Sequence, residues 1–143
     1  MSMLFRDCLC FSLGRISKKL NRVTRDSISA YGLTTTQFFL LIALYEENGI
    51  LISRLSEKVE VDKATLTGLL DRLERDKLVE RKLNTDDRRA IKISLTKKAE
   101  YLREDLLEIY NQNNNMFLSI LSTQEKETFE SVIDKLEHTN FKA

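Results

Sequence analysis

The fold is decided by the stretch TLTGLLDRLERDKLVERKLNTDDRRAIKISLT, residues 65–96, which changes its periodicity halfway. Up to Lys77 the leucines recur with the spacing of an amphipathic helix. From Leu78 on, apolar and polar residues alternate over residues 79–83 and 91–95, which predicts two strands with one buried face each. Between these strands, residues 84–89 are polar or charged. The stretch therefore predicts a helix followed directly by a hairpin, with two acids and two arginines near the tip.

The residues before this stretch predict another short helix and a tight turn. Ser53 is expected to cap a helix that carries Leu55. After a break at residues 60–61, Asp62 is expected to cap the next helix through the backbone amide of Thr65. Two short helices joined by a tight turn form a helix-turn-helix.

Helical spacing also predicts the segments before the helix-turn-helix. Residues 9–31 carry an apolar stripe that indicates a first helix. Thr34 and Gln37 have the spacing of a capping box, which would begin a second helix that ends near Gly49. The apolar run at residues 50–52 favours a short strand.

The last third of the chain predicts two more helices. Apolar residues recur over residues 99–120, which indicates one long helix, and the run NQNNN at residues 111–115 is where we expect it to bend or fray. Ser122 and Glu125 have capping-box spacing and would begin a final helix.

The composition is typical of one helix-rich globular domain. The chain has 143 residues, of which 42% are apolar and 31% charged, with no proline and four glycines. No apolar run approaches the roughly eighteen residues that cross a bilayer, and no signal peptide is evident, so we expect a cytoplasmic protein without a membrane partner. The net charge of +1 is compatible with nucleic acid but does not require it, because charge acts through local clusters.

Basic side chains cover much of the first predicted helix. They favour a solvated face, and the alternative is that they flank a phosphate backbone. They are Arg15, Lys18, Lys19, Arg22 and Arg25.

The helix at the start of residues 65–96 has a surface that suits the major groove of DNA, where base edges carry a code of donors and acceptors. Thr65 and Thr67 bring hydroxyls, and Gly68 lets the backbone come close to the bases. Asp62 would fix the helix start so that its positive end faces a phosphate. This chemistry predicts a recognition helix.

The hairpin tip suits the neighbouring minor groove. Its negative potential attracts an inserted arginine, which would be Arg88 or Arg89. Asp86 or Asp87 would accept hydrogen bonds from that guanidinium and hold it in place. The tip therefore needs both a positively charged arginine and a negatively charged aspartate.

Four motifs together resemble the multiple antibiotic resistance regulator (MarR) family of winged-helix transcription factors. They are TTTQF at residues 34–38, DKATLTGLLDRLERDKLVERK at 62–82, TDDRRA at 85–90 and ISLTKKA at 93–99. The resemblance implies a mainly α-helical winged helix-turn-helix of about six helices with a β-hairpin wing.

It also implies one domain over residues 1–143. The DNA-binding lobe would span residues 34–96, and residues 1–31 and 97–143 would supply the helices of a homodimer. The function it implies is repression from a pseudo-palindromic DNA operator. A small phenolic ligand or an oxidant, acting in the cleft between the dimer helices and the DNA-binding lobe, would change the spacing of the recognition helices and release the DNA.

The family's recognition-helix positions fall on Thr65, Thr67 and Arg72, and its wing pair falls on Asp86 and Arg88. The full set of residues predicted to bind DNA is Ser53, Lys63, Ala64, Thr65, Thr67, Gly68, Arg72, Asp86, Arg88 and Arg89.

The chain departs from the family pattern at three positions. Lys77 stands where the family usually ends the recognition helix with glycine, so we expect this lysine to adopt a left-handed conformation at a cost of about 1 kcal/mol. Ala99 replaces another common glycine. Gly68 stands where many members carry an arginine, which leaves the operator sequence open.

Cys10 is a candidate redox sensor. It belongs to the motif LCF at residues 9–11, 27 residues before Gln37, which is the spacing of the organic-peroxide-sensing branch of the family. The tyrosines of that branch are replaced here by Thr24 and Thr35. We therefore favour a structural, free cysteine over a sensing one, and whether Cys10 or Cys8 reacts with oxidants stays open.

Two rival functions are weighed against DNA binding. An enzyme is disfavoured because the chain lacks a phosphate-binding glycine loop, a nucleophile paired with histidine and a metal-binding helix motif. The single histidine, His138, makes a zinc site built from several histidines improbable, and no cofactor is implied. A winged helix that binds only proteins remains the alternative.

Overall fold

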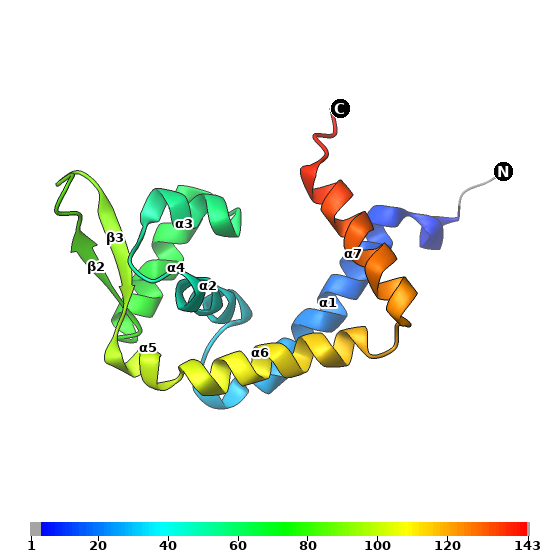
Figure 1. Ribbon diagram of the computed structural model, residues 1–143, viewed down its shortest axis with the longest axis horizontal. Helices are drawn as coiled ribbons and strands as arrows, with labels where there is room; N and C mark the ends of the chain where they lie inside the picture. The colour runs from blue at the N-terminus through cyan, green and yellow to red at the C-terminus, as the bar shows by residue number, and fades with distance from the viewer. Residues whose placement is uncertain (1–3, 143) are drawn as a thin grey trace. The chain divides into compact units, whose positions relative to one another are not determined.

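The computed structural model describes residues 4–142 and has the winged helix-turn-helix architecture that the sequence predicts (Figure 1). Its helices and strands, in chain order, are η1 (Phe5–Asp7), α1 (Leu9–Ser27), η2 (Ser29–Tyr31), α2 (Thr35–Glu46), β1 (Ile50–Leu51), α3 (Ile52–Val59), α4 (Lys63–Arg75), β2 (Val79–Leu83), β3 (Ile91–Leu95), α5 (Lys97–Tyr101), α6 (Arg103–Leu118) and α7 (Thr123–His138). The chain divides into two compact units, Met1–Ile109 and Tyr110–Ala143.

The three strands of the described chain form one antiparallel sheet in the order β1-β3-β2. The hairpin strands begin and end where the alternation predicts, and Arg81 pairs with Ile93 across them. One expectation was wrong: Leu83 does not lie on a buried face. Along the side of β2 that was expected to be buried, the exposed fraction rises from 2% at Val79 to 68% at Leu83, because only the first half of the strand packs against the core.

The core of the first unit lies where α2, α3 and α4 meet the sheet (Figure 1). Helix α2 is apolar on nearly every side because it is surrounded by other elements. Side chains from four elements are fully buried there: Phe38, Leu41 and Leu44 of α2, Leu55 of α3, Leu66, Leu70 and Leu73 of α4, and Ile93 of β3.

Local capping signals fix the start of α2 as predicted. The Thr34 hydroxyl accepts a hydrogen bond from the Gln37 amide at 3.2 Å, and the Gln37 side chain accepts one from the Thr34 amide at 2.9 Å. The first helix is shorter than expected. It ends at Ser27, and residues 29–31 form the separate 3-10 helix η2.

The helix expected over residues 99–120 is broken at Leu102, so the described residues contain seven α-helices rather than about six. The buried Tyr45 hydroxyl donates to the Ala99 carbonyl at 2.7 Å. Burial raises the pKa of Tyr45 to about 12, which keeps this donor protonated. Arg103 then donates to the Tyr45 carbonyl at 3.2 Å and pairs with Glu100 at 2.7 Å. These contacts hold the junction between α5 and α6 against α2.

Helix α6 stays helical through its asparagine run, so the expected fraying is not found. It continues through residues 111–115 to Leu118, and it ends before Ile120. Asn113 is 7% exposed, so the run has a buried side that favours continued helix despite its weak intrinsic propensity.

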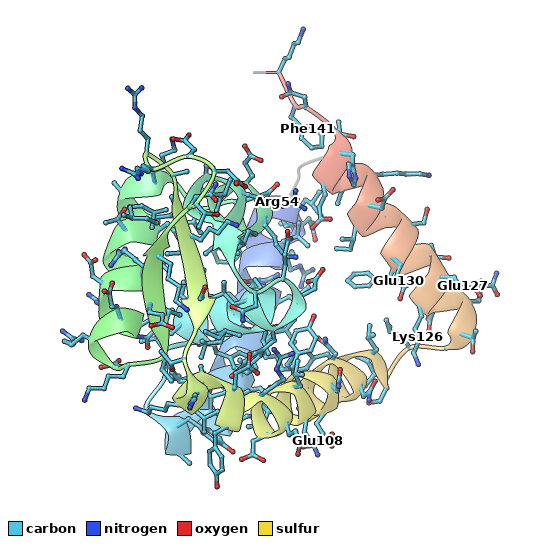
Figure 2. The ribbon with its side chains drawn as sticks, turned by 60° about the vertical axis from the view of Figure 1, so that its left-hand side comes forward. Arg54, Glu108, Lys126, Glu127, Glu130 and Phe141 are labelled. Atoms are coloured by element: carbon cyan, nitrogen blue, oxygen red, sulfur yellow. The ribbon has the colours of Figure 1, made fainter. Side chains whose placement is uncertain are left out.

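Helix α7 begins at the predicted capping box. The Ser122 hydroxyl accepts from the Glu125 amide at 3.2 Å, and the Glu125 carboxylate accepts from the Ser122 amide at 2.8 Å. Charged side chains such as Lys126, Glu127 and Glu130 follow along the helix (Figure 2). Phe129 and Val132 of the same helix are nearly half exposed, so α7 carries an apolar strip in the single chain.

Candidate nucleic-acid interface

The turn between α3 and α4 follows from one residue in a left-handed conformation. Glu60 ends α3 with a φ of 51°. The Ser56 hydroxyl donates to the Val61 carbonyl at 2.6 Å, which fixes the chain just after the turn. Helix α4 can then start at Lys63 with its own cap, as the sequence predicts.

Asp62 caps α4 through two hydrogen bonds. Its Oδ1 accepts from the Thr65 amide at 2.9 Å, and its Oδ2 accepts from the Thr65 hydroxyl at 2.7 Å. The bonds from Thr65 hold the pKa of Asp62 below its ordinary value, since they favour the charged carboxylate. The first turn of α4 is therefore held in place by an ionised cap.

Both predicted recognition threonines use their hydroxyl protons within the helix. Thr65 donates to Asp62, and Thr67 donates to the Lys63 carbonyl at 2.8 Å. A hydroxyl whose proton is engaged still has lone pairs that accept. In this arrangement the two side chains present acceptors and methyl groups, which suit the amino groups of adenine or cytosine and the methyl of thymine.

The outward face of α4 is exposed, as the sequence predicts. Leu66, Leu70 and Leu73 hold the opposite face in the core. A Cβ placed on Gly68 would meet no atom within 4 Å, so the surface is open there. The exposed predicted residues are Lys63, Ala64, Thr65, Thr67, Gly68 and Arg72.

Ser53 is exposed near the start of α3, but it does not cap the helix, so that expectation was wrong. Strand β1 pairs with β3 up to Leu51, and the helix begins immediately at Ile52. Sheet pairing therefore sets the helix start before the hydroxyl residue is reached. Arg54, the next residue of α3 (labelled in Figure 2), pairs with Glu47 at 3.1 Å.

Helix α4 ends with a left-handed residue at the position where the sequence predicts one. Lys77 has a φ of 58°, in the left-handed region. The Leu78 amide donates back to the Leu73 carbonyl at 2.8 Å, and the Lys77 carbonyl accepts from the Thr96 hydroxyl at 2.6 Å. The chain thus turns directly from α4 into β2.

The wing tip keeps its four charges exposed, but its acids and arginines are arranged differently from the prediction. Among residues 4–142, no hydrogen bond or ion pair joins the carboxylate of Asp86 or Asp87 to the guanidinium of Arg88 or Arg89. The Asp87 carboxylate instead accepts from the Arg89 backbone amide at 2.9 Å. A backbone amide two residues on is the nearest donor in a tight turn, so the acid stabilises the loop and leaves both guanidinium groups in solvent.

Sequence reasoning missed the contribution of Arg81. This residue of β2 pairs with Asp71 of α4 at 2.7 Å and also with Glu74. Burial alone would lower the pKa of Arg81, but the hydrogen bonds from its guanidinium to both carboxylates hold the pKa above its ordinary value. The sequence did hold a signal for this contact: Arg81 falls on the side of the strand that alternation predicts to be buried, and a buried charge needs an ionic partner.

The two cysteines lie near the start of α1, and both are free and exposed in the single chain. Thr24 is buried in the same helix, where its hydroxyl donates to the Leu20 carbonyl at 3.1 Å. Thr24 is fourteen positions after Cys10 in the helix, a rise of about 21 Å. Thr24 cannot reach Cys10 within one chain.

Residues 4–142 contain no group of three or more histidine, cysteine, aspartate or glutamate side chains placed to hold a metal ion. Over the same residues, no helix combines the length and apolar character needed to cross a membrane.

Comparison with known proteins agrees with this architecture. Residues 33–91 match the model of the MarR family. The chain is 34% identical over 130 residues to the HTH-type transcriptional repressor YetL of Bacillus subtilis (strain 168), covering 90% of this chain and 78% of that protein. It is 29% identical over 107 residues to the organic hydroperoxide resistance transcriptional regulator of the same organism, covering 75% and 73%.

Among solved structures, a mutant MarR protein of E. coli complexed with operator DNA superposes with a TM-score of 0.84 at 25% identity, covering 94% of this chain and 99% of that one. These relatives are transcriptional regulators rather than enzymes. With a winged helix-turn-helix whose helix and wing expose the predicted residues, the chain is a member of the MarR family of transcriptional regulators.

Proposed function

We propose that this regulator is a homodimeric repressor that binds a pseudo-palindromic operator and is released by a small ligand or an oxidant. The observation that carries the proposal is the exposed outward face of α4, capped by Asp62 and followed by a wing with two exposed arginines. Two copies would present their recognition helices about 34 Å apart, one turn of B-form DNA.

Homodimer formation is supported by apolar side chains that remain exposed on α1. Leu9, Leu13 and Ile16 recur at spacings of four and three and are 63%, 42% and 53% exposed. Residues with this spacing share one face of a helix, and a contiguous apolar face on a single chain is typical of an interaction surface. Light scattering should give twice the 16.7 kDa mass of one chain. A monomer at micromolar concentration would contradict the dimer.

Direct DNA binding is tested by selecting bound sequences from a random pool and titrating the best one with salt. Affinity should fall steeply as salt rises, because phosphate contacts release counterions. Arg88→Ala is expected to weaken operator binding by about 1–3 kcal/mol. Lys142→Ala removes the same charge beyond the end of α7 and should leave affinity unchanged.

Failure to select any sequence at low salt would favour the alternative function, a winged helix that binds other proteins. If the folded Arg88→Ala protein binds as tightly as wild type, the wing has no part in DNA binding.

A pocket of about 420 Å³ in the first unit supports regulation by a small ligand. Asn21 of α1, Thr35 and Phe39 of α2, and Val61 of the helix-turn-helix turn are among its lining residues. Its volume falls within the range of small-molecule sites, and it touches the turn that positions α4. A phenolic acid bound there would change the angle at which α4 leaves the turn.

Val61→Phe would fill this pocket. The variant should keep operator binding and lose release by those phenolic acids that release the wild-type protein. Release unchanged by the substitution would exclude this pocket.

Oxidant sensing is the other proposed route, with Cys10 as the reacting thiol. Cys10→Ser should prevent release of the operator by an organic hydroperoxide, whereas Cys8→Ser should leave it intact. The opposite pattern would assign sensing to Cys8, and release unchanged in both variants would exclude oxidation.

A further inference from the structure

Arg81 contacts three points of the recognition helix from the wing. Its Nη2 donates to the Asp71 carboxylate at 2.7 Å and to the Thr67 backbone carbonyl at 3.4 Å, and its Nη1 donates to the Glu74 carboxylate. The Arg81 side chain is 23% exposed, whereas those of Asp71 and Glu74 are 62% and 44% exposed. The guanidinium therefore lies partly covered, and its partners reach it from the surface of α4.

The geometry of these contacts restricts movement between the wing and α4. Thr67, Asp71 and Glu74 follow one another at spacings of four and three, so they lie along one side of the helix. A guanidinium is planar with donors in fixed directions, unlike an ammonium group. One that is bound to two carboxylates on successive turns resists both rotation of α4 and displacement of β2.

From this arrangement we propose that Arg81 is a positioning residue, which holds the wing against α4 so that the wing tip and the outward face of the helix meet DNA in one fixed relation. The inference rests on the proposed DNA-binding function. Thr67, whose carbonyl Arg81 contacts, is itself on the predicted DNA-binding face.

A purely electrostatic contribution is the competing explanation. Asp71 and Glu74 would repel phosphates, and the single positive charge of Arg81 offsets one of their two negative charges. The two explanations differ in what they predict for sequence discrimination, which is the ratio of nonspecific to operator dissociation constants. Charge alone changes both constants together, whereas loss of positioning reduces the ratio.

Two variants change the local charge in opposite directions. Arg81→Gln removes one positive charge, and the double variant Asp71→Asn with Glu74→Gln removes two negative charges. Nonspecific affinity should therefore fall in the first and rise in the second. If Arg81 positions the wing, both should lose discrimination by about tenfold, the middle of the range for residues coupled in one ionic network.

The triple variant, with all three substitutions, tests coupling. It should lose no more discrimination than Arg81→Gln alone, because the same contact is removed. Lys82→Gln is the matched control: its ammonium pairs with Glu80 on the same strand at 3.0 Å, so it removes a wing charge without detaching the wing from α4. It should lower both affinities and leave the ratio unchanged.

Hydrogen exchange provides a measurement without DNA. In Arg81→Gln and in the double variant, amides of the hairpin between Lys82 and Ile91 should exchange at least a few times faster than in wild type. Lys82→Gln should exchange at the wild-type rate.

The two readouts separate the failure of this inference from the failure of the proposed function. If the wild-type protein does not discriminate operator from other DNA, the proposed function is refuted. Hydrogen exchange would still decide whether Arg81 holds the wing. The positioning proposal would be overturned if the folded variants exchanged at wild-type rates. It would also be overturned if the wild type discriminated operator from other DNA and the variants discriminated equally well.

Discussion

Gly68→Ala is expected to make the protein more stable and a weaker DNA binder. Gly68 lies within α4, and a Cβ there meets no atom within 4 Å, so the methyl group causes no steric strain. Glycine inside a helix is about 0.8–1.0 kcal/mol less favourable than alanine. The free energy of unfolding should rise by that amount, with a midpoint in urea that increases at unchanged slope.

The same methyl group would lie between the helix backbone and the DNA if Gly68 permits close approach. Operator affinity, measured by fluorescence anisotropy at fixed salt, should fall about tenfold, or about 1.4 kcal/mol. Gly14→Ala is the matched control. Gly14 is also helical and open, so the stability gain should be similar and the operator affinity unchanged.

Two results would refute this reasoning at different points. A loss of stability would mean that Gly68 is not in an open, regular helix. A gain in stability with unchanged operator affinity would mean that the backbone at Gly68 does not approach DNA closely.

Three further predictions concern local structure. Lys77→Gly should raise the free energy of unfolding by about 1 kcal/mol in urea denaturation, because the lysine has a φ of 58°, and Lys77→Ala should give no such gain. Tyr45→Phe should lower the free energy of unfolding by about 1 kcal/mol, because the buried hydrogen bond to the Ala99 carbonyl is lost while that carbonyl still accepts from the Leu102 amide. An unchanged melting temperature would contradict this. The pKa of Asp62 is lower in the folded than in the unfolded chain, so its contribution to stability is present above the unfolded value and is lost as pH falls from about 4 through the folded value. Asp62→Asn keeps a cap without titrating, so its stability, measured by denaturation between pH 2 and 7, should fall less on acidification than that of wild type; equal slopes would refute the assignment.

Features set by neighbouring residues could be predicted from the sequence alone. The capping boxes at Thr34 and Ser122 and the cap at Asp62 require only a side chain and an amide three residues later. The strands β2 and β3 follow from a two-residue alternation, and the left-handed Lys77 follows from where the helix must end. Such signals act over a few bonds, so they do not depend on what lies across the fold.

The candidate site was predictable to the extent that exposure follows from helical spacing. Once Leu66, Leu70 and Leu73 are placed inside, Thr65, Thr67 and Gly68 must face outward. The prediction for Asp87 was wrong because two donors compete for its carboxylate. Asp87 binds the Arg89 amide, which is held close by the turn, rather than a flexible guanidinium that would lose more entropy.

The sequence by itself determined the order and type of most elements and the outward face of α4, because those depend on short periodicities and local caps. Tertiary structure alone decided that β1 starts α3 ahead of Ser53, that Tyr45 and Arg103 separate α5 from α6, and that Arg81 joins the wing to α4. The residues that these contacts join are separated in the sequence by 7 positions at the least and 58 at the most. They come close together only after the core has formed. Periodicity marks which side of an element is buried, but it does not specify the partner found there.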